Sequence, residues 1–310
     1  MRVGRYDNPD HTSNGHLTLA TPDLAADVHY TALRVARERD LLSIYAPGVG
    51  WDEYAGGSGN VAWALAEGRA DIGVGLTDSL ILERARGAPY RLVATFVASP
   101  LTWRVLVRSA ARAREVEGLR GETFGITRAG GGAHTMLLLL AADTGWRADV
   151  DYAVAPIGSL DALLRALKED MIDAFLWEAL TVERWLAAGV VRAVGTVVPP
   201  WPAFSIAART DAIAHDPDGV HGALRALRRA SAAVVAASDE MVALVARHYA
   251  LPPHASAGWL AHVRYADDGA LSRRAIEAAV AALRRTGAIE GALPVEDIVD
   301  HDHQFAPLLA

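Results

Sequence analysis

The sequence contains no cysteine, and this absence removes several kinds of chemistry. Disulfides, thiolate nucleophiles, lipid-bearing cysteines and cysteine-ligated zinc or iron–sulfur centres are all excluded. Lysine is almost as scarce, because Lys168 is the only one among 30 Lys and Arg residues. Any lysine-dependent chemistry would therefore have to pass through that one side chain.

Long apolar runs and excess positive charge are also missing. The longest apolar stretches, such as residues 136–142, fall well short of the roughly 18 to 20 residues that a membrane helix needs. The net charge of -7 gives no general attraction to nucleic acid or to anionic lipid. The residues after Met1 are polar, unlike a secretory signal. We expect no membrane span, no nucleic-acid partner and a cytoplasmic location, or an extracytoplasmic one if a leader has been removed.

What the chain does contain is enough apolar material for two packed lobes. It has 310 residues, of which 52 % are hydrophobic and 22 % charged. Short β-type runs alternate with helical ones, which favours an α/β fold with mostly parallel sheets. Prolines interrupt the pattern at Pro100 and at residues 199–202. We therefore predict two hinge crossings there, with one lobe made of residues 1–102 and 205–310 and the other of residues 103–204.

An internal repeat supports the two lobes. Ala64-Leu65 is followed by Asp71-Ile72, and at the same offset Ala166-Leu167 is followed by Asp173-Ala174. Each copy predicts a helix end, an acidic turn and a buried strand. In open α/β sheets ligands bind beyond the carboxyl ends of the strands, so we expect both strand ends to face one cleft.

The candidate site residues follow these predicted strands or lie in two glycine-rich segments, 56–60 and 127–135. Each glycine-rich segment precedes a helix, where unpaired backbone amides suit an anion, although a tight connector needs the same glycines. Residues 127–135 have neither Walker nor dinucleotide-binding spacing. The candidate ligand-binding residues are Asp23, His29, Gly57, Ser58, Thr77, Asp78, Thr127, Arg128, Gly131, Gly132, His134, Thr135, Trp177, Glu178 and Trp201.

Most of these residues also have structural explanations. Asp23 and Asp78 are equally typical of helix caps, His29 of a surface histidine, and Trp201 of packing under a crossing. For Glu178 we expect a place beside Trp177 in the cleft, so that Glu178→Gln changes ligand affinity more than stability; the alternative is an ion pair inside the second lobe. Residues 301–303 have metal-like His-Asp-His spacing, but a polar tail explains them, and we predict no metal site.

At this point the sequence resembles a known superfamily. Residues 56–58, 64–73 and 118–121 look like the nitrate, sulfonate and taurine branch of importer substrate-binding proteins. Residues 173–178, 200–202 and 206–209 are similar to a leaderless branch related to the thiamine pyrimidine-precursor synthase of fungi. The resemblance implies a type II periplasmic-binding-protein fold, whose two lobes hold a ligand between them.

The resemblance further implies a carrier or sensor of a small polar metabolite, with an ABC-type permease as partner if the protein is exported. Arg128 favours an anionic group, Asp78 and Glu178 an amine, and the tryptophans a flat ring, so we expect a zwitterionic or heteroaromatic ligand. The alternative is a leaderless enzyme on the same fold, such as a menaquinone-pathway lyase or a thiamine-pyrimidine enzyme. The synthase chemistry requires a cysteine-rich iron motif that this chain lacks. We therefore favour binding over catalysis and predict no catalytic residue and no cofactor.

Overall fold

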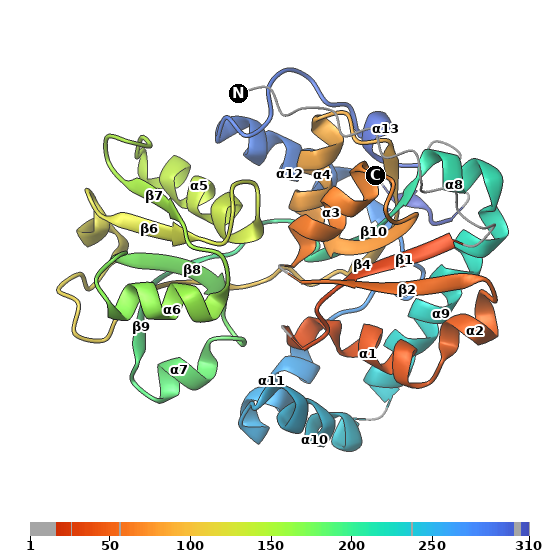
Figure 1. Ribbon diagram of the computed structural model, residues 1–310, viewed down its shortest axis with the longest axis horizontal. Helices are drawn as coiled ribbons and strands as arrows, with labels where there is room; N and C mark the ends of the chain where they lie inside the picture. The colour runs from red at the N-terminus through yellow and green to blue at the C-terminus, as the bar shows by residue number, and fades with distance from the viewer. Residues whose placement is uncertain (1–16, 26, 56, 237, 301–304, 310) are drawn as a thin grey trace.

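The computed structural model describes residues 17–25, 27–55, 57–236, 238–300 and 305–309. Within them the chain forms two α/β lobes, each built on a five-stranded sheet (Figure 1). His301 and His303, whose spacing suggests a metal, lie outside the described residues. Among the residues that are described, no helix combines the length and apolar character needed to cross a membrane.

The first sheet takes four strands from the start of the chain and a fifth from beyond its middle. Its strand order is β2-β1-β3-β10-β4. The strands are β1 (Leu17–Pro22), β2 (Val49–Tyr54), β3 (Ile72–Leu76), β4 (Tyr90–Val97) and β10 (Phe204–Arg209). β1 pairs in parallel with β2 and β3, whereas β10 is antiparallel to β3 and β4. The sheet is therefore parallel apart from one inserted strand.

The second sheet repeats this arrangement with the order β7-β6-β8-β5-β9. Its strands are β5 (Trp103–Arg108), β6 (Thr123–Ile126), β7 (Ala153–Pro156), β8 (Ala174–Glu178) and β9 (Val191–Val197). β6 pairs in parallel with β7 and β8, and β5 is the antiparallel strand between β8 and β9. By position, β1 corresponds to β6 and β3 to β8, and the inserted strand of each sheet comes from the far side of a crossing.

Helices cover the sheets and fill the remainder of the chain. Those before the second sheet are η1 (Val28–Tyr30), α1 (Thr31–Glu38), α2 (Leu41–Tyr45), α3 (Ser58–Ala66) and α4 (Thr77–Ala85). The second lobe has η2 (Val116–Leu119), α5 (Gly132–Thr144), α6 (Leu160–Lys168) and α7 (Glu183–Ala187).

The C-terminal part adds α8 (Thr210–His215), α9 (Pro217–Ala236), α10 (Ser238–Tyr249), α11 (Pro253–His262), α12 (Arg273–Arg285) and α13 (Val295–Ile298). Two short strands, β11 (Leu271–Ser272) and β12 (Leu308–Leu309), pair beside them.

The sequence repeat corresponds to a repeated pair of hydrogen bonds. In the first lobe the Thr18 amide donates to Asp71 Oδ2 at 2.8 Å, and the Asp71 amide donates to the Thr18 carbonyl at 3.0 Å. In the second lobe Thr123 and Asp173 make the same two bonds, both at 2.9 Å. Each aspartate therefore fastens the start of one parallel strand to its neighbour and sets the register of the central strands.

Two segments, residues 98–102 and 198–203, carry the chain between the sheets (Figure 1). They run side by side, because the Ala203 amide donates to the Ser99 carbonyl at 3.2 Å. The chain then enters each sheet at its inserted antiparallel strand, β5 or β10. The crossings therefore lead directly to the strands that lie beside β8 and β3.

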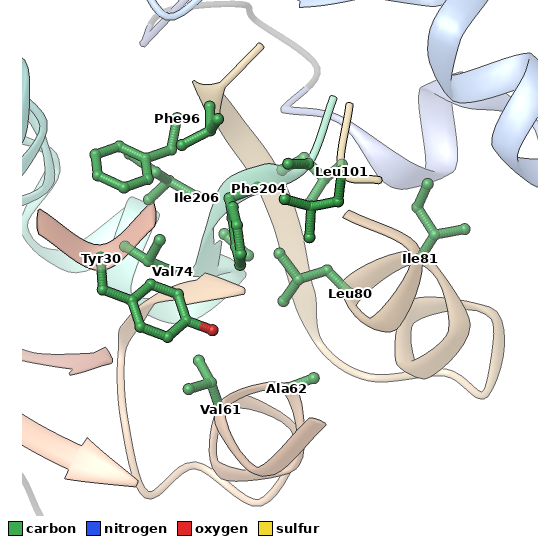
Figure 2. Packing of buried hydrophobic residues seen from close by; sticks show 14 of the residues in the cluster. Tyr30, Val61, Ala62, Val74, Leu80, Ile81, Phe96, Leu101, Phe204 and Ile206 are labelled. Carbon is green, nitrogen blue, oxygen red and sulfur yellow. The ribbon is translucent and has the colours of Figure 1, made fainter. Parts of the chain in front are cut away.

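The two lobes are in contact with each other. Figure 2 shows the main core of the first lobe, where the Tyr30 ring meets the Phe204 ring edge-on at 5.3 Å between centroids. This core continues into the second lobe through residues such as Phe124 and Leu137, while a smaller cluster around Phe175 belongs to the second lobe alone. A salt bridge of 2.9 Å between Arg285 of α12 and Asp143 of α5 also joins the lobes.

Candidate functional site

Most of the predicted site residues lie at the carboxyl ends of the parallel strands, where the two lobes meet. β3 leads into α4 and β1 into η1, while β6 leads into α5 and β8 ends at Glu178. We call this region the interlobe junction and define it by six side chains. His29, Ser58 and Asp78 come from the first lobe, and Arg128, Thr135 and Glu178 from the second.

On the first-lobe side the chain enters α3 through Gly57. Its φ of 80° lies in the left-handed region, which glycine adopts without steric cost. The next residue, Ser58, is buried, and its Oγ has no hydrogen-bond partner among the described residues. Thr77 is satisfied differently, because its Oγ1 lies 2.9 Å from Ser205 Oγ on the adjacent strand. The Thr77 hydroxyl therefore links α4 to β10, whereas the Ser58 hydroxyl has no such partner within the described residues.

Asp78 was a candidate N-cap of α4 from the sequence, but the N-cap residue is Leu76. Asp78 lies in the first turn of the helix, is only 2 % exposed, and its Oδ2 makes no hydrogen bond among the described residues. Burial raises the pKa of Asp78 to about 6, although nearby amides, Thr135 of the second lobe and Trp201 of the crossing oppose the shift. Asp78 is thus an under-solvated carboxylate against the opposite lobe.

On the second-lobe side the glycine-rich segment ends in α5. Gly131 is the N-cap residue, and the buried Thr135 donates back to the Gly131 carbonyl at 3.3 Å. His134 Nδ1 accepts from the Gly130 amide at 3.1 Å, and burial together with Arg86 lowers the pKa of His134, which keeps the ring neutral. Gly132 is packed too tightly for a side chain, because a Cβ would come within 2.6 Å of Leu76 in the first lobe.

Arg128, just after Thr127 at the end of β6, reaches across to the other lobe. Its guanidinium lies against Gly59 in the first turn of α3, and its Nε is buried without a partner among the described residues. Burial lowers the pKa of Arg128, with Glu83 opposing and Arg86 assisting. A helix N-terminus carries partial positive charge, so a guanidinium placed over it is electrostatically unfavourable. An anion beside Arg128 and the start of α3 would be attracted by both.

Glu178 meets two first-lobe side chains, Asp27 and His29. His29 Nδ1 lies 2.8 Å from Asp27 Oδ1, and one potential ligand atom from each of the three residues lies within 4.8 Å of the others. His29 is buried and not a surface histidine. Burial opposes its charged form, but Asp27 and Glu178 outweigh burial and raise the pKa of His29. Burial and the Asp27 charge also raise the pKa of Glu178.

Glu178 is not held by an arginine, which was the structural alternative from the sequence. Its Oε1 accepts from the Leu180 amide at 2.9 Å, and its Oε2 accepts from the Thr181 amide at 2.8 Å and the Thr181 hydroxyl at 2.9 Å. No Arg or Lys within the described ranges forms an ion pair with it. The carboxylate therefore organises its own turn while facing His29 across the junction.

The remaining candidates are placed differently. Trp177 packs against the second lobe's own apolar cluster, on the face of β8 opposite Glu178, because successive strand residues point to opposite sides. The expected pairing of Trp177 with Glu178 is therefore not formed. Trp201 is buried beside Asp78 in the crossing. The Asp23 carboxylate accepts from the Ala25 amide at 2.9 Å and lines a surface hollow of about 350 Å³ with Arg34 and Arg37.

Several junction residues escaped the sequence analysis. Asp27 orients His29, Arg86 faces His134, Ser205 pairs with Thr77, and Trp259 meets the His29 ring edge-on at 6.0 Å between centroids. The Asp-x-His spacing of residues 27–29 is the one signal that could have revealed Asp27. Ser205 and Trp259 carry no such signal, because they approach through the tertiary fold.

Solved structures with a similar architecture define the class of fold. The Candida albicans CA3427 gene product, described as defining a family with the generic periplasmic-binding-protein fold, superposes with a TM-score of 0.81 at 19 % identity, covering 92 % of this chain and 96 % of that one. The alkanesulfonate-binding protein SsuA of Xanthomonas axonopodis pv. citri, bound to MOPS, gives 0.74 at 18 % identity over 93 % and 97 %. The aliphatic sulphonate-binding SsuA of Escherichia coli gives 0.67 at 16 % identity over 92 % of both chains.

These similarities establish a two-lobed periplasmic-binding-protein fold, as the sequence resemblance implied. The profile of the NMT1/THI5-like family matches residues 53–241, more than half of the chain. The protein therefore belongs to the NMT1/THI5-like family, which confirms the predicted branch. A comparison with curated proteins gives no match.

Proposed function

We propose that the protein binds a small polar metabolite at the interlobe junction, with the two lobes closing around it as carriers or sensors of this fold do. The proposal rests on three of the buried polar atoms that have no hydrogen-bond partner within the described residues. They are Ser58 Oγ and Asp78 Oδ2 from the first lobe and Arg128 Nε from the second. Buried polar groups are nearly always hydrogen-bonded, so unsatisfied atoms contributed by both lobes indicate a missing partner between them.

The electrostatics of the junction favour a ligand with an anionic end. The Arg128 guanidinium lies against the first turn of α3, so an anionic group beside the two, such as a carboxylate, sulfonate or phosphate, would be attracted by both. The alkanesulfonate-binding relative is bound to MOPS, which carries a sulfonate and an amine. A ligand with an anionic group and an amine would likewise match Arg128 and the acidic side chains of this junction.

The opposite end of the ligand would meet acidic side chains. Asp78 is buried with an unsatisfied oxygen, and Glu178 carries a charge that no arginine or lysine of the described chain neutralises. An amine or ring N–H would supply the missing donor. The proposed ligand is therefore zwitterionic or a heteroaromatic metabolite with an acidic substituent. If the protein is exported, an ABC-type permease is the expected partner.

A thermal-shift screen against charged metabolites tests this proposal, followed by calorimetric titration of each compound that stabilises the protein. A ligand at a hundredfold excess over its Kd stabilises the native state by about 2.7 kcal/mol. Arg128→Gln should then weaken binding about ten- to a hundredfold, because one charge-assisted hydrogen bond is lost. Arg104→Gln is the matched control, since Arg104 donates to Thr196 at 3.0 Å on the second sheet.

Two results would count against the proposal. Equal affinities for wild type and Arg128→Gln would place the ligand elsewhere on the molecule. Conversion of the ligand during prolonged incubation would instead identify an enzyme on the same fold.

A further inference from the structure

We infer that Asp27, His29 and Glu178 form a divalent metal site that bridges the two lobes. The inference deepens the proposed function, because it assigns a cation to the same junction. It stands on a separate group of side chains from Ser58, Asp78 and Arg128, so the two can fail independently.

The first support is the geometry of the donor atoms. Asp27 and His29 follow β1 in the first lobe, Glu178 ends β8 in the second, and one donor atom from each lies within 4.8 Å of the other two. Three ligands about 2.0–2.2 Å from one zinc-like ion lie about 3.3 to 3.8 Å from one another. Donor atoms that lie up to 4.8 Å apart therefore approach one another by up to about 1.5 Å when the ion binds.

The second support is that the three side chains are already oriented. Asp27 Oδ1 accepts from the His29 backbone amide at 2.8 Å and also lies 2.8 Å from His29 Nδ1, which holds the carboxylate and the imidazole side by side with their donor atoms adjacent. The ring is bracketed by Phe204 and Trp259, with centroids 6.1 and 6.0 Å away. Asp27 Oδ1 and His29 Nδ1 are therefore placed as neighbouring ligands of one ion.

The third support is an uncompensated charge. Glu178 is 4 % and His29 6 % exposed, so two carboxylates and one imidazole meet where water has little access. Within the described residues, the ion pair between Asp27 and His29 is the sole salt bridge made by any of the three. Backbone amides satisfy part of Glu178, but amides carry no full charge. A divalent cation would neutralise the cluster.

The donor set also indicates which metals fit. One imidazole and two carboxylates suit Zn²⁺, Co²⁺, Fe²⁺ or Mn²⁺, whereas copper(I) prefers sulfur ligands that this chain provides only as methionine. Three protein ligands leave coordination positions for water or for an acidic group of the ligand. Because the donors come from both lobes, metal binding would favour the closed arrangement.

The test uses the full chain, stripped with a chelator and titrated with CoCl₂ by visible absorption and with ZnCl₂ by calorimetry. We expect one equivalent of metal to bind. His29→Gln and Asp27→Asn should each weaken binding by tenfold or more, and Glu178→Gln likewise if circular dichroism shows that it folds. The His29 and Asp27 variants keep the test valid should the Glu178 variant unfold.

Two controls locate the metal. His262→Gln removes an exposed imidazole whose Nδ1 lies 2.7 Å from the Gly258 carbonyl, and it should leave the affinity unchanged. The double variant His301→Gln with His303→Gln should also bind normally, which separates the junction from the C-terminal histidines.

The inference is overturned if the wild type binds neither metal at millimolar concentration, or if His29→Gln binds as tightly as wild type. Titrating a metabolite found by the thermal screen in the presence of chelator distinguishes the two proposals. If a metabolite binds but no metal does, the metal site is wrong and the proposed function stands. If a metal binds but no metabolite does, the metal site stands and the proposed function is wrong.

Discussion

Asp78 and Glu178 lie at the carboxyl ends of equivalent strands in the two lobes, yet their hydrogen-bond partners differ. Both are nearly fully buried, at 2 % and 4 % exposure. Glu178 accepts three hydrogen bonds from the turn that follows it, whereas Asp78 Oδ2 makes none within the described chain. The comparison separates a carboxylate whose two oxygens are both held by its own turn from one that keeps an oxygen without a partner in the described chain.

The local sequence explains this difference. After β8 the chain turns through residues 179–181 and does not enter a helix at once, so the Leu180 and Thr181 amides point back at Glu178. After β3 the chain passes directly into α4, and Asp78 lies within the first helical turn. Equivalent strands therefore place an acidic side chain at the carboxyl end of each sheet. The residues that follow decide whether backbone amides hydrogen-bond to both of its oxygens.

The largest expected effect is a loss of stability in Glu178→Gln. The new amide group must face a backbone donor, so we expect the free energy of unfolding to fall by about 3 kcal/mol. This prediction differs from the sequence-based expectation that the substitution would hardly affect folding, because Glu178 is buried and its oxygens accept from backbone amides. Urea unfolding at pH 7 measures the change. The matched Glu183→Gln in α7 should differ from wild type by less than about 0.5 kcal/mol.

Asp78→Asn should have the opposite sign. The pKa of Asp78 rises from 3.8 to about 6, so ionising it in the folded protein costs up to about 3 kcal/mol, and the variant avoids this cost. We expect Asp78→Asn to be more stable than the ligand-free wild type by about 2 kcal/mol at pH 7.5. A destabilised Asp78→Asn would show that a partner already satisfies Oδ2.

The pH dependence gives the same prediction a second check. The folded protein binds the Asp78 proton more tightly than the unfolded chain does, so protonation of Asp78 stabilises the wild type. This contribution to stability is complete below about pH 4 and is lost as the pH rises through about 6. The difference between wild type and Asp78→Asn should therefore grow over that interval and be near zero at pH 3.5. Parallel unfolding curves at each pH would contradict the assigned pKa.

Asp71 and Asp173, which immediately precede β3 and β8, allow a second comparison between the two lobes. Asp71→Asn and Asp173→Asn each weaken a charge-assisted bond to a strand amide, worth roughly 1.5 kcal/mol. Asp173 also repels Glu122, whose pKa is raised first by burial and then by the Asp173 charge. Thermal unfolding should therefore show a smaller loss for Asp173→Asn than for Asp71→Asn. Equal losses would mean that the repulsion from Glu122 is negligible.

Gly59→Ala should have the smallest effect on folding. A methyl group there meets only the end of the Arg128 side chain, which can move, so we expect a change in unfolding free energy of less than about 1 kcal/mol. Ligand affinity should fall more clearly, because Arg128 would be displaced from α3. A large stability loss on urea unfolding would instead show that Arg128 cannot move away.

The sequence predicts the fold better than the site, for physical reasons. Periodicity and the repeated aspartates identify β3 and β8, since strand formation there depends on local burial and on the register bonds to Thr18 and Thr123. The meeting of His29 with Glu178 depends on how two lobes pack, and no local pattern encodes that.

Neighbouring residues can also be separated by the pleat of a strand. Trp177 and Glu178 are adjacent in sequence but face opposite sides of β8, so proximity along the chain suggested a shared site that the structure does not form. Asp78 was a candidate cap from its position after a strand, but α4 begins one residue before it.

The most direct test of the account is the affinity of a metabolite identified by the thermal screen for a double variant, Ser58→Ala with Arg128→Gln. These changes remove one unsatisfied polar atom from each lobe. We predict an affinity at least a hundredfold below wild type by calorimetric titration, with Arg104→Gln unchanged. A double variant that folds and binds with wild-type affinity would contradict the claim that the ligand lies between the lobes.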